Sequence, residues 1–226
     1  FSGKKVTVVG TGISGIGAVG LLNAVGAEVV LYDGNEKLKI EDIEKKLGTY
    51  KAEIVLGELT KELTDSSDLL VISPGVPIDS PVVKAFEAAG VPVWGEVELA
   101  YAFDKGKVLA ITGTNGKTTT TALVGQIVGA YHKDTFVVGN IGNPYTTEVL
   151  KSNKDSYTVA EISSFQLETV HEFHPLVSAI LNITPDHLNR HYTMDCYVQT
   201  KEKIAMNQKG SEVCVLNFDD DYLREF

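Results

Sequence analysis

The chain has 226 residues, of which 43% are hydrophobic and 22% charged, as in ordinary globular proteins and unlike disordered chains. No apolar run approaches the about 20 residues of a membrane-spanning helix, and residues 1–5 show no secretory leader, so we expect a cytoplasmic protein. Thirty acidic against twenty basic residues give a formal net charge of −10, which argues against nucleic acids and membrane surfaces as partners.

The first part of the chain alternates strands and helices, as a parallel sheet requires. We predict strands at 6–9, 28–32, 69–72 and 91–94, and helices at 16–25, 40–47 and 81–89. Pro81 stands near the first turn of the last helix, where proline is favoured. We place a domain boundary between residues 94 and 95, before a short helical stretch at 96–103.

A second alternation follows. It predicts strands at 108–111, 135–138, 157–160, 177–183 and 213–216, with helices at 118–130 and 194–207. The expected class is α/β, with a Rossmann-like parallel-sheet domain over residues 1–94 and a phosphate-loop type α/β domain over residues 95–226. Residues 217–221 read as a turn into a helix that stops at Phe226, so we expect the second domain to be incomplete.

A glycine-rich turn follows the first predicted strand: Gly10-Thr11-Gly12-Ile13-Ser14-Gly15. With Asp33 at the end of the second strand, it forms a dinucleotide fingerprint, in which glycines admit a diphosphate to a helix N-terminus and the acid binds a ribose hydroxyl. Taken alone it predicts NAD, but a UDP-sugar carries the same diphosphate. The glycines could also serve only strand–helix packing. The turn at 73–77, with Ser73 and Gly75, is expected at the same sheet edge, or is a plain turn.

The most informative run follows the strand at 108–111: Gly113-Thr114-Asn115-Gly116-Lys117-Thr118-Thr119. A strand that leads through a glycine turn into a helix directs backbone N–H groups at a phosphate. Lys117 adds a cation, and the Thr118 hydroxyl is placed to ligate the Mg²⁺ of a nucleoside triphosphate. The run is a variant of the usual phosphate loop, because two residues instead of four separate its first glycine from Gly116.

Further acidic and basic side chains are expected at the same sheet edge as Lys117. Glu161 ends the strand at 157–160, where a second acid commonly completes a Mg²⁺ site, and a polar run at 163–167 follows it. The pair Asp186-His187 follows the strand at 177–183. We interpret His132, His171, His174 and His191 as ordinary surface or loop residues, and Cys196 and Cys214 as buried structural thiols without metal-ligand spacing.

Together the motifs resemble the Mur ligases. The resemblance rests on four blocks, at 113–119, 139–142, 161–168 and 182–187. Within the family, the segments at 163–167 and 95–99 are similar to the D-glutamate-adding members. Folylpolyglutamate synthetases share only the phosphate loop and the general plan.

The resemblance implies an ATP-dependent peptide synthase that joins D-glutamate to UDP-N-acetylmuramoyl-L-alanine through an acyl phosphate, in peptidoglycan precursor synthesis. It implies that Lys117 neutralises the β- and γ-phosphates, while Thr118 and Glu161 hold one Mg²⁺. His187 would help to hold a second Mg²⁺, together with Lys201, which matches a lysine that the family carbamylates. Gly113 to Thr119 would bind ATP.

The resemblance also reassigns the first fingerprint from NAD to the UDP substrate. The residues implied in that site are Gly12, Ile13, Ser14, Gly15, Asp33, Ser73, Gly75, Asn140, Ser163 and Gln166. Asn189 stands where the family often has an acid, which puts the role of that position in doubt. The family's third domain, which brings the D-glutamate site, is not expected in this chain, so we expect no turnover by it alone and a monomer. The alternatives are another Mur-type or folylpolyglutamate-type ligase, an NAD-dependent oxidoreductase, and a binding module without catalysis.

Overall fold

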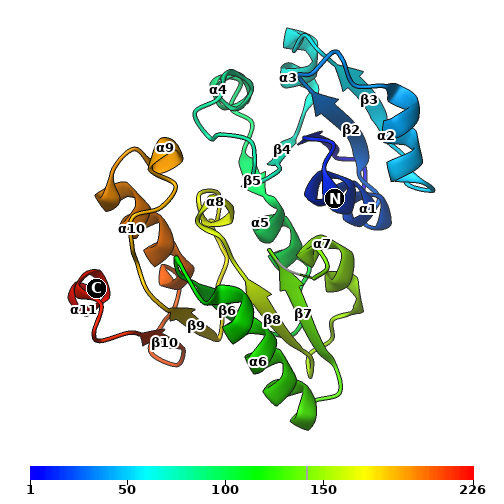
Figure 1. Cartoon of the computed structure of the whole chain (residues 1–226). Coiled ribbons are helices and arrows are strands. Elements are labelled where there is room, and N and C mark those ends of the chain that lie inside the picture. Colours follow the sequence, from blue (N-terminus) through cyan, green and yellow to red (C-terminus); the bar gives the residue numbers. More distant parts are fainter. Residues whose placement is uncertain (141) are drawn as a thin grey trace.

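The computed structural model describes residues 1–140 and 142–226 (Figure 1). Over these residues it contains two five-stranded sheets in which every strand pair is parallel. The predicted α/β class with a Rossmann-like sheet followed by a second parallel sheet is therefore confirmed. No helix in the described parts of the chain is long and apolar enough to cross a membrane.

The first sheet has the strand order β3-β2-β1-β4-β5. Its strands are β1 (Lys5–Val9), β2 (Glu28–Asp33), β3 (Glu53–Leu56), β4 (Leu69–Ile72) and β5 (Val93–Gly95). The helices between them are α1 (Ile13–Ala24), α2 (Ile40–Leu47), α3 (Lys61–Ser66) and α4 (Pro81–Ala88). The sequence predicted neither β3 nor α3, because both are short and β3 is only half-buried, which leaves little hydrophobic pattern to detect.

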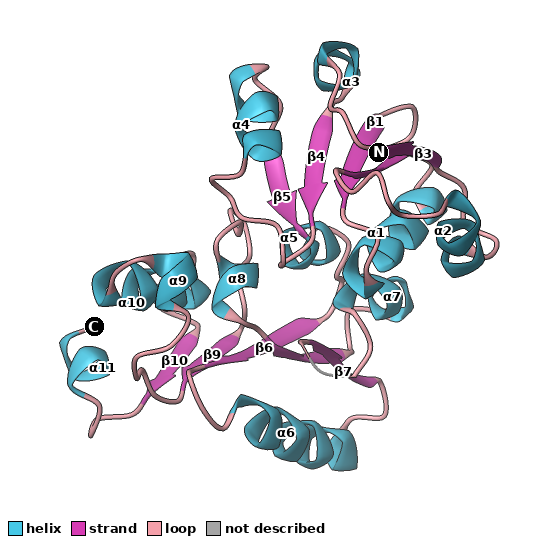
Figure 2. Ribbon diagram, turned by 45° about the horizontal axis from the view of Figure 1, so that its top comes forward, coloured by secondary structure: helices cyan, strands magenta, loops and turns pink. Residues whose placement is uncertain are grey.

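The second sheet has the strand order β10-β9-β6-β8-β7. Its strands are β6 (Lys107–Thr112), β7 (Thr135–Gly139), β8 (Tyr157–Glu161), β9 (Val177–Ile180) and β10 (Val213–Leu216). The longer helices are α6 (Lys117–Tyr131) and α10 (Met194–Glu202), and the short ones are α5 (Glu96–Tyr101), α7 (Tyr145–Glu148), α8 (Ser164–Leu167), α9 (Leu188–His191) and α11 (Asp221–Glu225). Figure 2 shows α6 on one face of this sheet and α7, α8, α9 and α10 on the other.

Several boundaries differ from the sequence prediction: the helix predicted at 194–207 ends at Glu202, and the strand predicted at 91–94 spans Val93–Gly95. Two other differences have a clear physical reason. Helix α1 begins at Ile13, three residues earlier than expected, because Gly12 already serves as its N-cap in an extended conformation. Strand β9 ends at Ile180, and the next residues leave the sheet to bind the phosphate loop, where Asn182 O accepts from Thr114 N at 2.9 Å.

Helix α5 lies between the two sheets, in contact with α1, α7 and α8 (Figures 1 and 2). Five of its six residues are buried, including Glu98. Both oxygens of Glu98 accept from backbone N–H groups of the segment after α8: Oε2 from His171 and Phe173, and Oε1 from Glu172. Ionised carboxylates are strong hydrogen-bond acceptors. Glu98 therefore anchors α5, the helix between the two sheets, to the second sheet's segment after α8.

Candidate functional site

The carboxyl ends of four adjacent strands in the second sheet carry most of the residues expected in catalysis. The register pairs Ile111 on β6 with Glu161 on β8, and Glu161 with Gly139 on β7. The phosphate loop therefore follows β6 beside the strand that ends in Glu161, and Asn140 follows on the other side. Ligands of open parallel sheets bind at this edge. The strand order therefore brings together groups that lie far apart in the sequence.

The phosphate loop is braced by the segment after β9. Asn182 accepts from Asn115 N through its side-chain oxygen at 2.9 Å and donates through Nδ2 to Asn115 O at 3.0 Å. Gly113 and Gly116 have φ angles of 147° and 83°, in a region that favours glycine, and Gly116 caps α6. Thr118 and Thr119 are exposed in the first turn of α6. The loop thus has fixed backbone N–H groups at the positive end of a 15-residue helix.

Two lysine ammonium groups converge on this loop. Lys117 Nζ donates to Gly113 O at 3.0 Å and to Thr114 O at 2.9 Å. Lys201, from α10, donates to the same Gly113 O at 2.9 Å and is only 1% exposed. Burial, together with the charge of Lys117, lowers the pKa of Lys201 to about 7, while Asp186 acts in the opposite direction. Two cations that share one carbonyl form a site that favours an anion.

Glu161 supplies a buried carboxylate beside this loop. Its Oε1 accepts from Asn140 Nδ2 at 2.8 Å, whereas Oε2 is buried without a hydrogen-bond partner in the described part of the chain. A buried oxygen of this kind is unfavourable unless a ligand completes its bonding. The register places Glu161 at the same sheet edge as the phosphate loop, as the sequence predicts, and Asn140 donates to its carboxylate. Residue 141 of the family-like block at 139–142 lies outside the described residues.

His187 lies at the N-cap of α9 with a φ of 51°, which is uncommon for a residue other than glycine. Its side chain is half-exposed, lies 3.4 Å from Asp186 Oδ2 through Nε2, and packs on the ring of Phe165 with centroids 4.9 Å apart. The hydrogen bonds in the described residues do not join His187 to Glu161 or Lys117. His187 therefore follows β9 at the same edge of the sheet without a hydrogen bond to either of them in the described residues.

The exposure of His191 was misjudged from the sequence. His191 is not a surface residue: it is 1% exposed and its Nε2 lies 2.9 Å from Ser164 Oγ. Burial, with the charges of Arg190, Lys201 and His187, lowers the pKa of His191 to about 4, so the ring is neutral at pH 7. The two thiols were misjudged as well, because Cys196 is exposed and Cys214 is only partly buried. Single-residue exposure depends on which elements pack above a position, which local sequence does not encode.

The glycine turn of the first sheet is tightly built. A Cβ at Gly15 would overlap the carbonyl oxygen of Gly10, and one at Gly10 would lie 2.7 Å from Ser73 Oγ. Asp33 is engaged within the turn: its Oδ2 accepts from Thr11 N at 3.3 Å and from Thr11 Oγ1 at 3.1 Å. Asp33 therefore lies at the glycine turn, as the fingerprint predicts, and Ser73 packs against Gly10 of the same turn. Gly75 is exposed on the neighbouring turn.

Ser163 and Gln166 bond to each other in a capping box at the start of α8. Gln166 Oε1 accepts from Ser163 N at 2.8 Å and from Ser163 Oγ at 2.9 Å. Gln166 Nε2 donates to Glu96 Oε1 at 2.7 Å. The sequence did not single out Glu96 as a functional residue, although the acidic segment at 95–99 was a visible signal. The capping box alone gives both residues a structural role.

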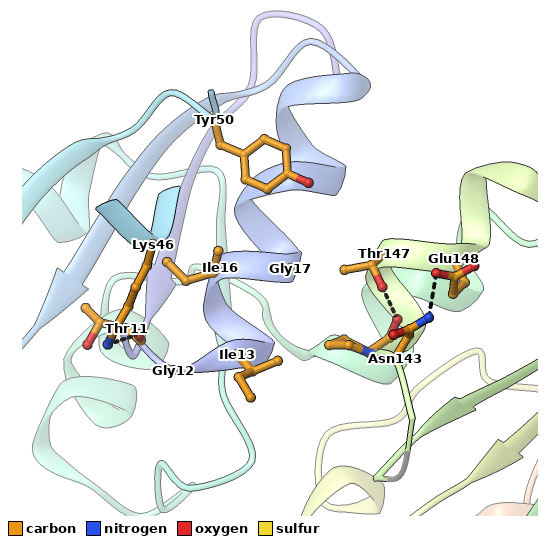
Figure 3. Close-up of a pocket in the computed structure, with 11 residues that line it drawn as sticks. Thr11, Gly12, Ile13, Ile16, Gly17, Lys46, Tyr50, Asn143, Thr147 and Glu148 are labelled. Carbon is orange, nitrogen blue, oxygen red and sulfur yellow. Dashed lines mark hydrogen bonds between the residues drawn. The ribbon is translucent and has the colours of Figure 1, made fainter. Parts of the chain in front are cut away.

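A cleft of about 660 Å³ opens beside the first glycine turn (Figure 3). One side is formed by the start of α1 and by α2, and the other by the segment leading into α7. The lining residues are Thr11, Gly12, Ile13, Ile16, Gly17, Lys46, Tyr50, Asn143, Pro144, Thr147 and Glu148. Of the ten residues expected to bind the UDP substrate, only Gly12 and Ile13 line it. The cleft therefore adjoins the expected site without containing most of it.

The side chains at this edge of the second sheet include possible ligands for a divalent cation. Within the described residues, no group of three or more His, Cys, Asp or Glu side chains is arranged to hold a metal ion. The possible metal ligands at this edge are instead of three chemical types: the carboxylate oxygen Oε2 of Glu161, the hydroxyl of Thr118 and the imidazole of His187. Carboxylate and hydroxyl oxygens suit Mg²⁺, which is often bound by few protein ligands together with phosphate oxygens. The residues therefore fit a metal that arrives with a triphosphate.

Two domain families match the chain. The Mur ligase middle domain matches residues 111–226, and the Mur ligase MurD-like N-terminal domain matches residues 4–95. The curated relatives named UDP-N-acetylmuramoylalanine--D-glutamate ligase include one from Lachnospira eligens, 70% identical over 223 residues, and one from Lachnoclostridium phytofermentans, 58% identical over 225 residues. Each alignment covers 99% of this chain and 50% of the relative, so the chain spans about half the length of these relatives.

Solved structures share the fold at low sequence identity. The UDP-N-acetylmuramate:L-alanyl-gamma-D-glutamyl-meso-diaminopimelate ligase from Neisseria meningitides aligns with a TM-score of 0.61 at 16% identity, over 99% of this chain and 74% of its own. A murein peptide ligase from Psychrobacter arcticus aligns with a TM-score of 0.57 at 16% identity, over 99% of this chain and 51% of its own. These similarities concern the arrangement of the two sheets.

Proposed function

This chain belongs to the Mur ligase family, whose middle domain matches residues 111–226, and on that premise we propose that the complete protein adds D-glutamate to UDP-N-acetylmuramoyl-L-alanine at the expense of ATP. The observation that carries the proposal is the convergence of Lys117 and Lys201 on Gly113 O beside the unpartnered Oε2 of Glu161. Residues 1–94 would bind the UDP precursor and residues 95–226 would bind ATP.

The chemistry begins with a carboxylate, which is a poor electrophile. A carboxylate oxygen of the substrate's alanine attacks the γ-phosphorus of ATP, the bond to the β-bridging oxygen breaks, and ADP leaves. The amine of D-glutamate then attacks the carbonyl carbon of the acyl phosphate, phosphate leaves, and the nitrogen loses a proton. Lys117 and the N–H groups of residues 113–119 would offset the phosphate charge during the first step, in which two anions must meet.

Mg²⁺ fits the mixed donor set described above. Thr118 and Glu161 would hold one ion, and His187 with a carbamylated Lys201 would help to hold a second. Bound Mg²⁺ would supply charge neutralisation between the γ-phosphate and the substrate carboxylate. The lowered pKa of Lys201 supports its modification, because only a neutral amine can attack the carbon of CO₂, forming the N–C bond and releasing a proton.

The UDP substrate would lie across the two sheets. Gly12, Ile13, Ser14, Gly15 and the acid Asp33 would bind its uridine diphosphate end, with Ser73 and Gly75 beside them. Asn140, Ser163 and Gln166 would lie near its sugar and peptide. The proposal includes a monomeric protein and, since ATP and UDP-linked precursors are its substrates, a cytoplasmic one.

The test uses the complete protein. Calorimetry should show tighter binding of UDP-N-acetylmuramoyl-L-alanine than of NAD, and phosphate release from ATP should require that substrate. Tight NAD binding without a uridine ligand would favour an oxidoreductase. Binding of the UDP substrate without ATP turnover in the presence of D-glutamate and Mg²⁺ would favour a binding module instead.

A further inference from the structure

Glu96 and Glu98 are both buried on α5, with 3% and 2% exposure, but they are bonded differently. Both oxygens of Glu98 accept from backbone N–H groups. Glu96 accepts through Oε1 from Gln166 Nε2 at 2.7 Å, whereas its Oε2 is buried without a hydrogen-bond partner in the described residues. A carboxylate that served only the fold would be satisfied at both oxygens, as Glu98 is, because an unpartnered buried oxygen is destabilising.

The carboxyl group of Glu96 lies near the first glycine turn, because helix α5 packs against helix α1, which begins at that turn. Ser14 is the second residue of α1, and the first N–H groups of a helix have no partner within it. The Ser14 hydroxyl lies near enough to favour the ionised form of Glu96, although no hydrogen bond of normal geometry joins it to Oε2. The Ser14 hydroxyl therefore lies between Glu96 and the N-terminus of α1, where an anion would bind.

The elements that surround Glu96, namely α1, α7, α8, β4 and β5, contain no lysine, arginine or histidine within their bounds. Helices α1 and α8 and strands β4 and β5 carry no titratable side chain within their bounds. The other titratable groups on α5 and α7, and Glu168 directly after α8, are each bonded elsewhere: Glu98 to backbone N–H groups, Tyr101 to His174 O, Tyr145 to Asp104, Glu148 to Lys151 and Glu168 to Arg190. Burial raises the pKa of Glu96, and the hydrogen-bonding influence of Ser14 and Gln166 only partly opposes the rise.

Gln166 fixes where a proton on Glu96 would reside. Its Oε1 already accepts from Ser163 N and Ser163 Oγ, so its Nε2 must face Glu96 as a donor. Oε1 of Glu96 is therefore an acceptor, and a proton taken up by the carboxyl belongs on Oε2, which has no hydrogen-bond partner in the described residues.

We propose that Glu96 is a positioning residue that takes up a proton when a diphosphate binds at the turn before α1, and that the protonated carboxyl turns the Ser14 hydroxyl toward the diphosphate. This inference rests on the proposed function, which places the diphosphate of the UDP substrate there. A hydroxyl has one proton to donate. If Glu96 is ionised, Ser14 donates to Oε2 and presents lone pairs to the phosphate oxygens. If Oε2 is protonated, it donates to Ser14 Oγ, and the Ser14 proton is free for the diphosphate.

The proton taken up on binding provides the test. Calorimetry of the complete protein with UDP-N-acetylmuramoyl-L-alanine, in buffers of different ionisation enthalpy from about pH 5 to about pH 9, should show uptake of up to one proton per ligand. Affinity should fall about tenfold per pH unit between the pKa values of Glu96 in the free and bound protein, because the bound state holds the proton more tightly. An absence of uptake at every pH would overturn the inference.

Variants separate this role from a structural one. Glu96→Gln keeps an acceptor for Gln166 and offers an amide donor to Ser14, so it should bind within about threefold of the wild-type affinity at low pH and take up no proton. Glu96→Ala should bind about tenfold more weakly at low pH. Ser14→Ala should also abolish the uptake. Uptake that persists in Glu96→Gln or Ser14→Ala contradicts the proposed relay.

Glu98→Gln is the matched control, because it changes an equally buried carboxylate two residues away. It should lower stability and leave the proton uptake unchanged; a loss of uptake there would point to a general effect of α5. A wild-type protein that binds no UDP ligand would contradict the proposed function itself, which distinguishes that failure from the failure of this inference.

Discussion

Replacement of Lys201 by methionine is expected to stabilise the protein when no nucleotide is bound, and more at low pH than at high pH. The pKa of the buried ammonium falls from 10.5 to about 7 on folding, chiefly through burial and secondarily through Lys117. Between these two values the unfolded chain binds a proton that the folded chain does not. The stability of the wild type therefore rises with pH across this interval, and below about pH 7 the whole penalty is present.

The gap between the two pKa values corresponds to about 5 kcal/mol, which is an upper limit because the fold can relax around an ammonium group. Methionine has a similar shape and no charge. We expect Lys201→Met to be more stable than the wild type by about 2–4 kcal/mol at about pH 6, and this advantage to shrink by about 1–3 kcal/mol at about pH 9.

Urea unfolding of the complete protein in CO₂-depleted buffer, at both pH values, measures this difference. Other titrating groups cancel when the variant is compared with the wild type at each pH. Lys203→Met is the control, because Lys203 is only half-buried and its ammonium donates to Glu168 O at 3.0 Å. A stability difference for Lys201→Met that does not change with pH, or a wild type that is more stable at about pH 6, would refute the reasoning.

Three further outcomes are expected. Glu161→Gln should lower ATP-dependent acyl-phosphate formation by about 100-fold or more, with the affinity for the UDP substrate unchanged in calorimetry; near-normal turnover would remove Glu161 from the mechanism. Arg190→Met should destabilise the protein by about 3–5 kcal/mol in urea unfolding, because it leaves the buried Glu168 unpaired, and adding Glu168→Met should restore much of the loss. Gly15→Ala should destabilise by about 3 kcal/mol or more, since its Cβ overlaps Gly10 O, whereas Gly12→Ala meets no atom within 4 Å and should unfold like the wild type; equal unfolding of the two variants would contradict the packing argument.

Local sequence was sufficient for most elements. The helix at 40–47 and the strands at 69–72 and 213–216 have the predicted bounds, because apolar periodicity and turn residues are read within a few positions. The glycine turns were also visible, since a strand, a turn and a helix must occur in that order in the chain. Their ligands and the residue roles stay predictions, and so does the boundary between residues 94 and 95.

Sequence patterns alone therefore determined an α/β chain with two glycine turns, each between a strand and a helix. Only the tertiary structure decided which distant groups meet: Lys201 bonds to Gly113, 88 positions away, and Glu96 bonds to Gln166, 70 positions away. It also buried His191, which the sequence favoured as a surface residue. The reason is physical. Periodicity reports which face of an element is apolar, whereas the order of strands in a sheet and the packing of α5, α9 and α10 against it determine which polar groups lose water and must find partners.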